Sequence, residues 1–201
     1  MPLKFYNDEI VENPTHIISV VDDFTYNQPV SLIFTYDPEN GADARIRVTD
    51  LNGVEYFKSK DNVILYDNSN KAIFKLSQKF TCTKVYIGTD KTRTLAKIKY
   101  DGSYTYKVEY YNQKTESDEV IFLYCDKHYC SGAIFQGKEG EKGSVIIGKI
   151  VELMDANSFV INAETKFLLN IAPNVDNALI ISLAMYFINK NKIHRCNKEE
   201  Q

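Results

Sequence analysis

Short segments in which apolar and polar residues alternate fill most of the chain between residues 29 and 171. They are rich in aromatic and β-branched residues, and turn-forming residues separate them at intervals of about ten residues, a pattern typical of all-β sandwiches and barrels. The predicted strands are Pro29–Tyr36, Ala44–Thr49, Val54–Lys58, Val63–Tyr66, Lys71–Leu76, Phe80–Ile87, Leu95–Tyr100, Tyr104–Tyr111, Val120–Cys125, Tyr129–Phe135, Val145–Val151, Phe159–Asn162 and Lys166–Ile171.

The pattern changes at Asp176–Asn189, where the alternation gives way to a helical stretch. Within it, Ala178–Ile188 is apolar at every position except Ser182. A helix that is apolar on all sides is buried in protein or in lipid. Because this stretch is about half of the roughly 20 residues that cross a bilayer, a buried core helix is favoured over a membrane anchor. Asp176 is placed to cap the first turn.

One predicted hairpin can be tested by the alternation of its residues. A two-residue Asp101-Gly102 loop would place apolar side chains opposite charged ones. A three-residue loop, Asp101–Ser103, pairs Tyr100 with Tyr104 and keeps one face apolar throughout, so we predict this register. The opposite, outward face then carries three lysines, Lys97, Lys99 and Lys107.

A short repeat supports a meander of successive hairpins. The segment Val48–Lys58 recurs as Leu65–Lys75, and each copy is a strand, a turn that begins with Asp, and a second strand. The Asp side chain can accept hydrogen bonds from the backbone two residues on, and Gly53 or Asn70 can adopt a positive φ.

The composition adds limits on function. The chain has 201 residues and a net charge of −3, so we expect one main domain and no general attraction to nucleic acid. The first residues lack the apolar core of a signal peptide, and four scattered cysteines are too few for a secreted disulfide framework. We therefore expect a cytoplasmic monomer, with peripheral contact to the inner face of a membrane as an option.

Several segments resemble a known superfamily. They are Gly148–Ile150, Phe159–Ile161, Ile171–Pro173, the Val175-Asp176 pair that leads into the apolar helix, and the hairpin Val48–Phe57. Together they resemble the tubby C-terminal-like superfamily, most closely its LURP-one-related branch and more distantly the phospholipid scramblases. The resemblance implies a closed antiparallel barrel of about twelve strands around a buried hydrophobic C-terminal helix. It divides the chain into an N-terminal extension (1–28), the barrel domain (29–190) and a polar C-terminal tail (191–201).

The resemblance also implies a binding function. In tubby proteins, basic residues on adjacent strands hold a phosphoinositide, so Lys97, Lys99 and Lys107 form the candidate site for an anionic phospholipid headgroup. The alternative is a solvated polar face that Glu109 partly neutralises. Arg45 and Arg47 share a second outward face. We expect a non-catalytic module that docks a membrane phospholipid or a protein partner. The alternatives are a scramblase-like lipid-translocating protein and a pure protein adaptor.

Other motifs carry less chemistry. The chain has three histidines and no Gly-x-Ser-x-Gly motif, so no catalytic site is predicted. Cys125, His128 and Cys130 could begin a zinc site, but two free cysteines that face each other on neighbouring strands are favoured. Gly137–Gly143 lacks the features of a phosphate loop and is expected to be a mobile, charge-balanced loop. Asp155–Phe159 corresponds to the proposed calcium-binding stretch of scramblases, but it has a single acid and is expected to be a β-turn. No metal or cofactor is predicted.

Overall fold

The structure, a computed structural model, describes residues 9–10, 14–37, 45–61, 63–153 and 164–199. It contains a short 3-10 helix, η1 (Asp22–Phe24), and a C-terminal helix, α1 (Asn177–Glu199). Its strands are β1 (Val30–Asp37), β2 (Arg45–Thr49), β3 (Glu55–Ser59), β4 (Ile64–Asp67), β5 (Ala72–Gln78), β6 (Thr83–Ile87), β7 (Thr94–Gly102), β8 (Thr105–Asn112), β9 (Ser117–Cys125), β10 (Ser131–Gln136), β11 (Val145–Leu153) and β12 (Thr165–Ile171).

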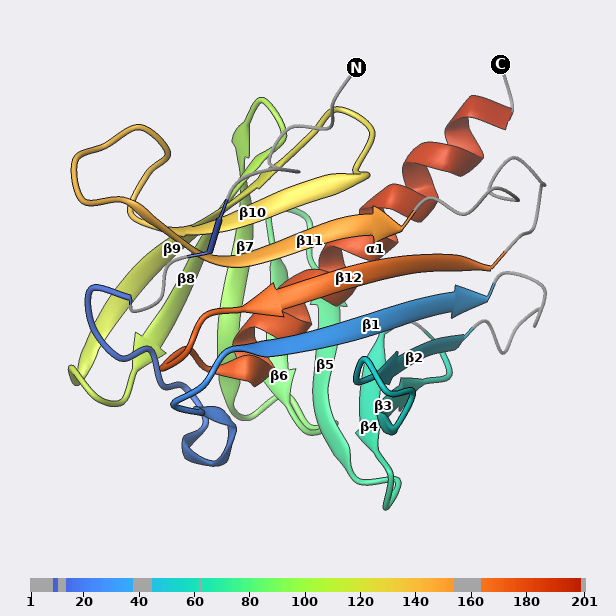
Figure 1. The fold of residues 1–201 in the computed structure, drawn as a ribbon, viewed down its shortest axis with the longest axis horizontal. Coiled ribbons are helices and arrows are strands. Elements are labelled where there is room, and N and C mark those ends of the chain that lie inside the picture. The colour runs from blue at the N-terminus through green and yellow to red at the C-terminus, as the bar shows by residue number, and fades with distance from the viewer. Residues whose placement is uncertain (1–8, 11–13, 38–44, 62, 154–163, 200–201) are drawn as a thin grey trace.

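The strands form one closed antiparallel barrel. Each pairs with its neighbour in the chain, and β1 closes the barrel by pairing with β12 over seven residues, from Val30 opposite Ile171 to Tyr36 opposite Thr165 (Figure 1). Closure leaves no strand edge free to pair with another chain. The predicted fold is therefore confirmed. Of the predicted strands, only Phe159–Asn162 lies outside the described residues.

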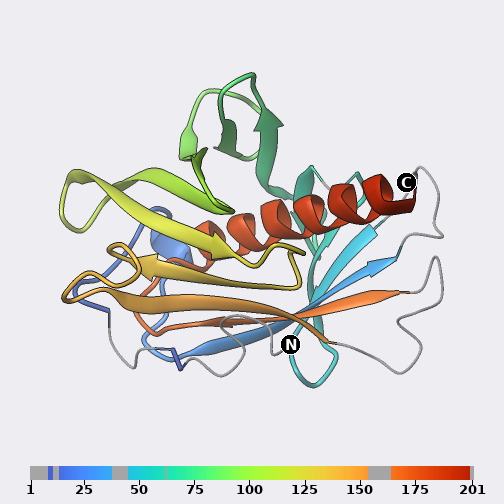
Figure 2. The ribbon, with the colours of Figure 1, turned by 90° about the horizontal axis from the view of Figure 1, so that it is seen from above.

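The helix α1 runs through the middle of the barrel, between β10–β12 on one side and β5–β8 on the other (Figure 2). Every side chain from Ala178 to Ile188 is buried, as the apolar pattern predicts. Ser182, the one polar residue among them, donates its hydroxyl to the carbonyl oxygen of Leu179 at 2.7 Å. The helix continues past the predicted end at Asn189 to Glu199. No helix among the described residues is long and apolar enough to cross a membrane.

The two ends of the barrel are defined by the direction of α1. The helix-entry end holds the start of α1 and the turns β2–β3, β4–β5, β6–β7, β8–β9 and β10–β11. The helix-exit end holds the C-terminal part of α1 and the turns β3–β4, β5–β6, β7–β8 and β9–β10.

Two glycines in the barrel wall let α1 approach the sheet. A Cβ atom at Gly132 would lie 3.0 Å from the ring of Phe187, and one at Gly148 would lie 3.2 Å from the side chain of Ile180. Such distances are too short for a packed interior, so side chains at these positions would push the helix away. Gly148 belongs to the Gly-Lys-Ile segment that carries the family resemblance. The close approach of Ile180 gives a physical reason for a glycine at this position.

Asp176 joins the helix to the N-terminal segment. One carboxylate oxygen caps the helix by accepting a hydrogen bond from the Leu179 N–H at 2.9 Å, as predicted. The other accepts from the N–H groups of Val20 at 2.7 Å and Val21 at 2.6 Å. Ile18 and Val20 are buried in the core, so this part of the predicted N-terminal extension packs against the helix-entry end.

The repeated hairpin forms two copies of one turn, as predicted. Asp50 accepts from the N–H groups of Asn52 and Val54, and Asp67 does the same for Ser69 and Lys71. The fourth residue of each turn, Gly53 or Asn70, has a positive φ, of 85° and 63° respectively.

A third copy of this turn begins at Asp126, in a segment where the sequence predicts a hairpin turn but not this type. Asp126 accepts from the N–H groups of His128 and Cys130, and Tyr129 takes the left-handed position with φ of 55°. A bulky side chain rarely adopts this conformation, so packing around Tyr129 must hold it. Its hydroxyl lies 2.6 Å from that of Tyr106, and its ring packs on Phe187.

The register predicted for the β7–β8 hairpin is wrong by two residues. Tyr100 pairs with Tyr106 rather than with Tyr104, and the turn is Ser103-Tyr104, both with positive φ. An irregularity between Tyr100 and Gly102 leaves Asp101 unpaired. A shift of two residues keeps every side chain on its predicted face, so the predicted outward direction of the lysines is unaffected.

Candidate anion-binding site

The three predicted lysines lie on the outer face of the β7–β8 hairpin, where strand pairing brings them together. Lys99 is directly opposite Lys107, and Lys97 is opposite Glu109. Lys97 is exposed, whereas Lys99 and Lys107 are half-buried along their stems.

A fourth lysine, which the sequence analysis missed, extends this group. Lys84 on β6 pairs directly with Lys97. Lys75 on β5 points to the same outer face, because Ser77, two residues further along β5, is opposite Lys84. We call Lys75, Lys84, Lys97, Lys99 and Lys107 the lysine face. The alternation of Thr83, Lys84 and Val85 shows that Lys84 points outward, but only the register reveals its partner.

Two pairs of the lysine face place like charges directly opposite each other, which is unfavourable in an isolated sheet. Glu109 relieves one of them, because its carboxylate lies 2.8 Å from the Lys99 Nζ and 3.3 Å from the Lys107 Nζ. The hydrogen bond from Lys99, with a smaller contribution from Lys107, lowers the pKa of Glu109. Among the described residues, no carboxylate pairs in this way with Lys84 or Lys97. Glu109 is opposite Lys97, but its carboxylate pairs with Lys99 and Lys107, so the Lys84–Lys97 pair has no carboxylate within ion-pair distance among the described residues.

Carboxylates limit the lysine face on its helix-entry side. A groove of about 370 Å³ runs from Lys97 past Glu109 and Tyr111 to Asp118 and Glu119. Acidic side chains outnumber basic ones there, so the groove does not favour an anion. Lys97 lies at the border of this acidic groove, and Lys99 and Lys107 lie beyond it towards the helix-exit end.

The second predicted basic face is weaker. Arg47 is opposite Lys58 on β3, but its guanidinium pairs with Glu164 at 3.1 Å. Glu164 also pairs with Lys166 at 3.1 Å. The side chain of Arg45 lies outside the described residues.

The cysteine cluster does not have the predicted arrangement. Cys125 pairs with Gly132 across the hairpin, and Cys130 lies in the turn that Asp126 begins, so the two cysteines do not face each other. Burial raises the pKa of the Cys125 thiol well above its ordinary value and that of Cys130 to about 12, which keeps both thiols protonated. His128 lies beside His194, but the described residues contain no group of three or more potential metal ligands.

Two further segments named in the sequence analysis are the glycine-rich loop and the stretch compared with scramblases. Gly137–Gly143 forms successive turns closed by backbone hydrogen bonds from Glu141 to Lys138 and from Ser144 to Glu141, and it leads into strand β11. Asp155–Phe159, compared above with the scramblase calcium stretch, lies outside the described residues.

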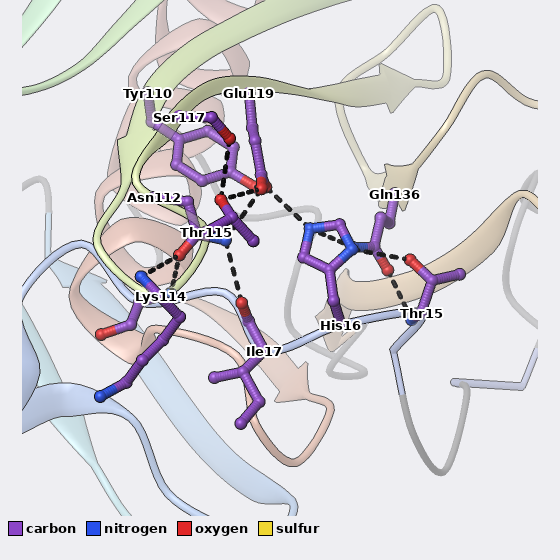
Figure 3. A network of polar contacts seen from close by, with 11 residues as sticks. Thr15, His16, Ile17, Tyr110, Asn112, Lys114, Thr115, Ser117, Glu119 and Gln136 are labelled. Atoms are coloured by element: carbon purple, nitrogen blue, oxygen red, sulfur yellow. Dashed lines mark hydrogen bonds and ion pairs between the residues drawn. The ribbon is translucent and has the colours of Figure 1, made fainter.

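A polar network around Glu119 fastens the N-terminal segment to the barrel (Figure 3). The carboxylate accepts from Tyr110 at 2.7 Å, Asn112 at 3.1 Å and Thr115 at 2.6 Å, and it contacts the His16 Nε2 at 2.9 Å. Burial alone would raise the pKa of Glu119, but these four hydrogen bonds outweigh it and lower the pKa to about 2.

The same network occupies His16. The Gln136 amide lies 3.2 Å from both ring nitrogens, and the Thr15 hydroxyl lies 3.2 Å from the Nδ1. The Asn112 amide also donates to the Ile17 carbonyl oxygen at 2.9 Å. The polar groups of the network thus bind one another and attach residues 15–17 to the barrel, which is a structural role.

Comparison with protein families identifies the chain. The model of the LURP-one-related family matches residues 40–188, well over half of the sequence. The chain belongs to the LURP-one-related family. The closed barrel with its central helix agrees with the relationship of that family to the tubby-like superfamily. Comparison with curated proteins and with solved structures gave no match. The LURP-one-related family and its barrel fold are of a non-enzymatic binding type.

Proposed function

We propose that this LURP-one-related protein is a non-catalytic module that docks to anionic phospholipid headgroups through the lysine face. The observation that carries the proposal is the Lys84–Lys97 pair, two cations side by side on adjacent strands that have no carboxylate within ion-pair distance in the described part of the chain. A phosphorylated headgroup would supply the missing negative charge. Lysine side chains bind phosphate as point charges, so they accept headgroups of differing geometry.

Glu109 forms ion pairs with Lys99 and Lys107, and it would therefore compete with an anionic ligand for both lysines. The Glu109→Gln variant removes the competing charge and frees both lysines. We expect it to bind vesicles of phosphatidylcholine with a polyphosphorylated phosphoinositide more tightly than the wild type. Each additional basic charge at a membrane surface contributes about 1 kcal/mol, so the gain should be roughly fivefold or more. Binding should weaken as salt is added.

Asp90→Asn is the control. Asp90 lies in the exposed β6–β7 turn at the helix-entry end, and its substitution changes the net charge by the same amount. If both variants gain equally, net charge alone drives binding and the lysine face is not a site.

Loss-of-function variants complete the test. Replacing Lys97, Lys99 and Lys107 by Ala removes about 3 kcal/mol of attraction, more than a hundredfold in affinity. Replacing Lys71, Lys91 and Lys142, which lie in exposed turns at the helix-entry end, removes the same charge elsewhere and should have little effect. A wild-type protein that ignores every anionic vesicle would refute lipid docking and favour a protein partner.

A further inference from the structure

Aromatic side chains stand exposed on two neighbouring turns at the helix-exit end. Phe80, at the tip of the β5–β6 turn, is fully exposed, and Tyr100 and Tyr104 of the β7–β8 hairpin are 66% and 42% exposed. The turns are adjacent because Thr83, at the start of β6, pairs with Ile98 on β7. Single exposed apolar residues are common, but a group of aromatic residues on neighbouring tips indicates an interaction surface.

The charges around these tips are mainly basic. Lys79 precedes Phe80, and further cations at the helix-exit end are Lys60, Lys127, Lys190 and Lys192. Acids elsewhere at this end include Asp37, Asp61, Asp126 and Glu152, and Glu152 pairs with Arg195. On the two tips Lys79 and Asp101 balance each other, so the net positive charge comes from the adjoining lysine face, where Glu109 is the one acid among the described residues. The surface therefore complements a negatively charged partner.

The helix-entry end offers a useful contrast. Leu51 and Val54, in the β2–β3 turn, are also strongly exposed, at 62% and 54%. The turn that carries them, residues 50–55, contains no lysine or arginine, and its charged residues are Asp50 and Glu55. Exposed apolar residues and positive charge thus coincide only at the helix-exit end among the described residues.

We propose that the helix-exit end inserts Phe80, Tyr100 and Tyr104 into the interfacial layer of an anionic membrane. This inference rests on the proposed lipid docking and gives its orientation: the barrel stands on the membrane by this end, with Lys99 and Lys107, the lysines of the face closest to the Tyr104 tip, at headgroup level. Tyrosine suits such a layer, because its ring is apolar and its hydroxyl stays hydrated.

The spacing along the strands fits this orientation. Lys107 lies three residues from the tip at Tyr104, which is about 10 Å along a strand. The polar layer of one leaflet is about 5–8 Å thick. With the aromatic tips at the boundary of the hydrocarbon, the long side chains of Lys107 and its partner Lys99 therefore reach the phosphates.

The absence of tryptophan from the chain permits a direct test. Phe80→Trp places a single fluorophore at the proposed insertion point, and Leu51→Trp places one at the opposite end. Both variants are mixed with vesicles of phosphatidylcholine and phosphatidylserine, with and without a polyphosphorylated phosphoinositide. We expect a blue shift of emission and quenching by brominated acyl chains for Phe80→Trp, and neither effect for Leu51→Trp.

Cosedimentation of the same samples separates this inference from the proposed function. If the variants sediment with vesicles and the Phe80→Trp emission stays unshifted, the protein docks but does not insert this end, and the inference is overturned. The same conclusion follows if Leu51→Trp is the variant that shifts. If neither variant sediments with any vesicle, lipid docking itself fails.

A second pair of variants measures the strength of insertion. Phe80→Ser should weaken vesicle binding about tenfold or more, because burying a phenylalanine side chain is strongly favourable. Leu51→Ser should leave binding unchanged. The Phe80 side chain contacts solvent on all sides, so Phe80→Ser should keep the wild-type melting temperature, which excludes unfolding as the cause.

Discussion

Asp176 is the residue on which the helix and the N-terminal segment both depend, and its replacement tests that connection. The Asp176→Ala variant removes the helix cap, which contributes about 1 kcal/mol. It also leaves the N–H groups of Val20 and Val21 without their acceptor, at about 1–3 kcal/mol each. The wild-type carboxylate is fully buried, so the stabilisation from its hydrogen bonds is partly offset by the cost of removing it from water.

The pKa of Asp176 shows the same offset. Burial raises its pKa above the ordinary 3.8, although backbone N–H groups of Val21, Leu179, Val20 and Ala178 act in the opposite direction. The folded state therefore holds the proton more tightly than the unfolded chain. The contribution of Asp176 to stability is greatest at low pH and decreases as pH rises through the folded pKa.

We expect Asp176→Ala to lose about 2–4 kcal/mol at neutral pH, a large share of the 5–15 kcal/mol typical of a domain. Urea unfolding followed by circular dichroism measures the loss, and amide exchange at Val20 and Val21 should accelerate. Asp90→Ala is the control, because that carboxylate accepts only from Thr92 in an exposed turn and its removal should cost little. A loss below about 1 kcal/mol for Asp176→Ala would show that the N-terminal segment does not depend on this carboxylate.

Two further predictions concern the core and the Glu119 network. Leu183→Asp should prevent folding, because it places a charge without a partner in the middle of the buried helix, at a cost of several kcal/mol or more; a soluble variant with wild-type thermal unfolding would contradict the buried position. The pKa of Glu119 is lowered to about 2 in the folded protein. Its contribution to the free energy of unfolding is therefore fully present above about pH 4.5, the pKa in the unfolded chain, and is lost as the pH falls towards 2. The loss amounts to at most about 3 kcal/mol. Urea unfolding of the wild type and of Glu119→Gln between pH 6 and pH 3 should show a smaller pH dependence for the variant, and equal slopes would assign the acid sensitivity to other carboxylates.

Local patterns were enough to predict most strands, the helix and the outward faces, although β6 begins at Thr83 rather than at the predicted Phe80. The alternation around Lys97 and Lys99 fixed the direction of these side chains, and the Asp-led repeat fixed two turns. Such features depend on a few consecutive residues, so the sequence carries them directly. The hairpin register was missed because Tyr104, a residue that rarely adopts a positive φ, occupies the turn.

The missed features depend on contacts between distant residues. The link from Asp176 to Val20 joins segments 156 residues apart, and the pairing of Lys84 with Lys97 requires the register of β6 against β7. The Asp126 turn escaped notice because Tyr129 stands where Gly53 and Asn70 stand in the other copies. Packing against Tyr106 and Phe187 stabilises Tyr129 there, and no local pattern reveals that packing.

The position of α1 in the chain has a consequence for how the protein folds. All twelve strands precede the helix that fills the barrel, so during synthesis they emerge before the side chains they must cover. Until α1 is available, the inner faces of the strands have no partner, and β1 can meet β12 only after most of the chain has been made. Pairings over such long separations form slowly and leave apolar strands open to association with other chains. We therefore expect the nascent barrel to rely on chaperones, and to acquire its native stability in a single late step when the helix is enclosed.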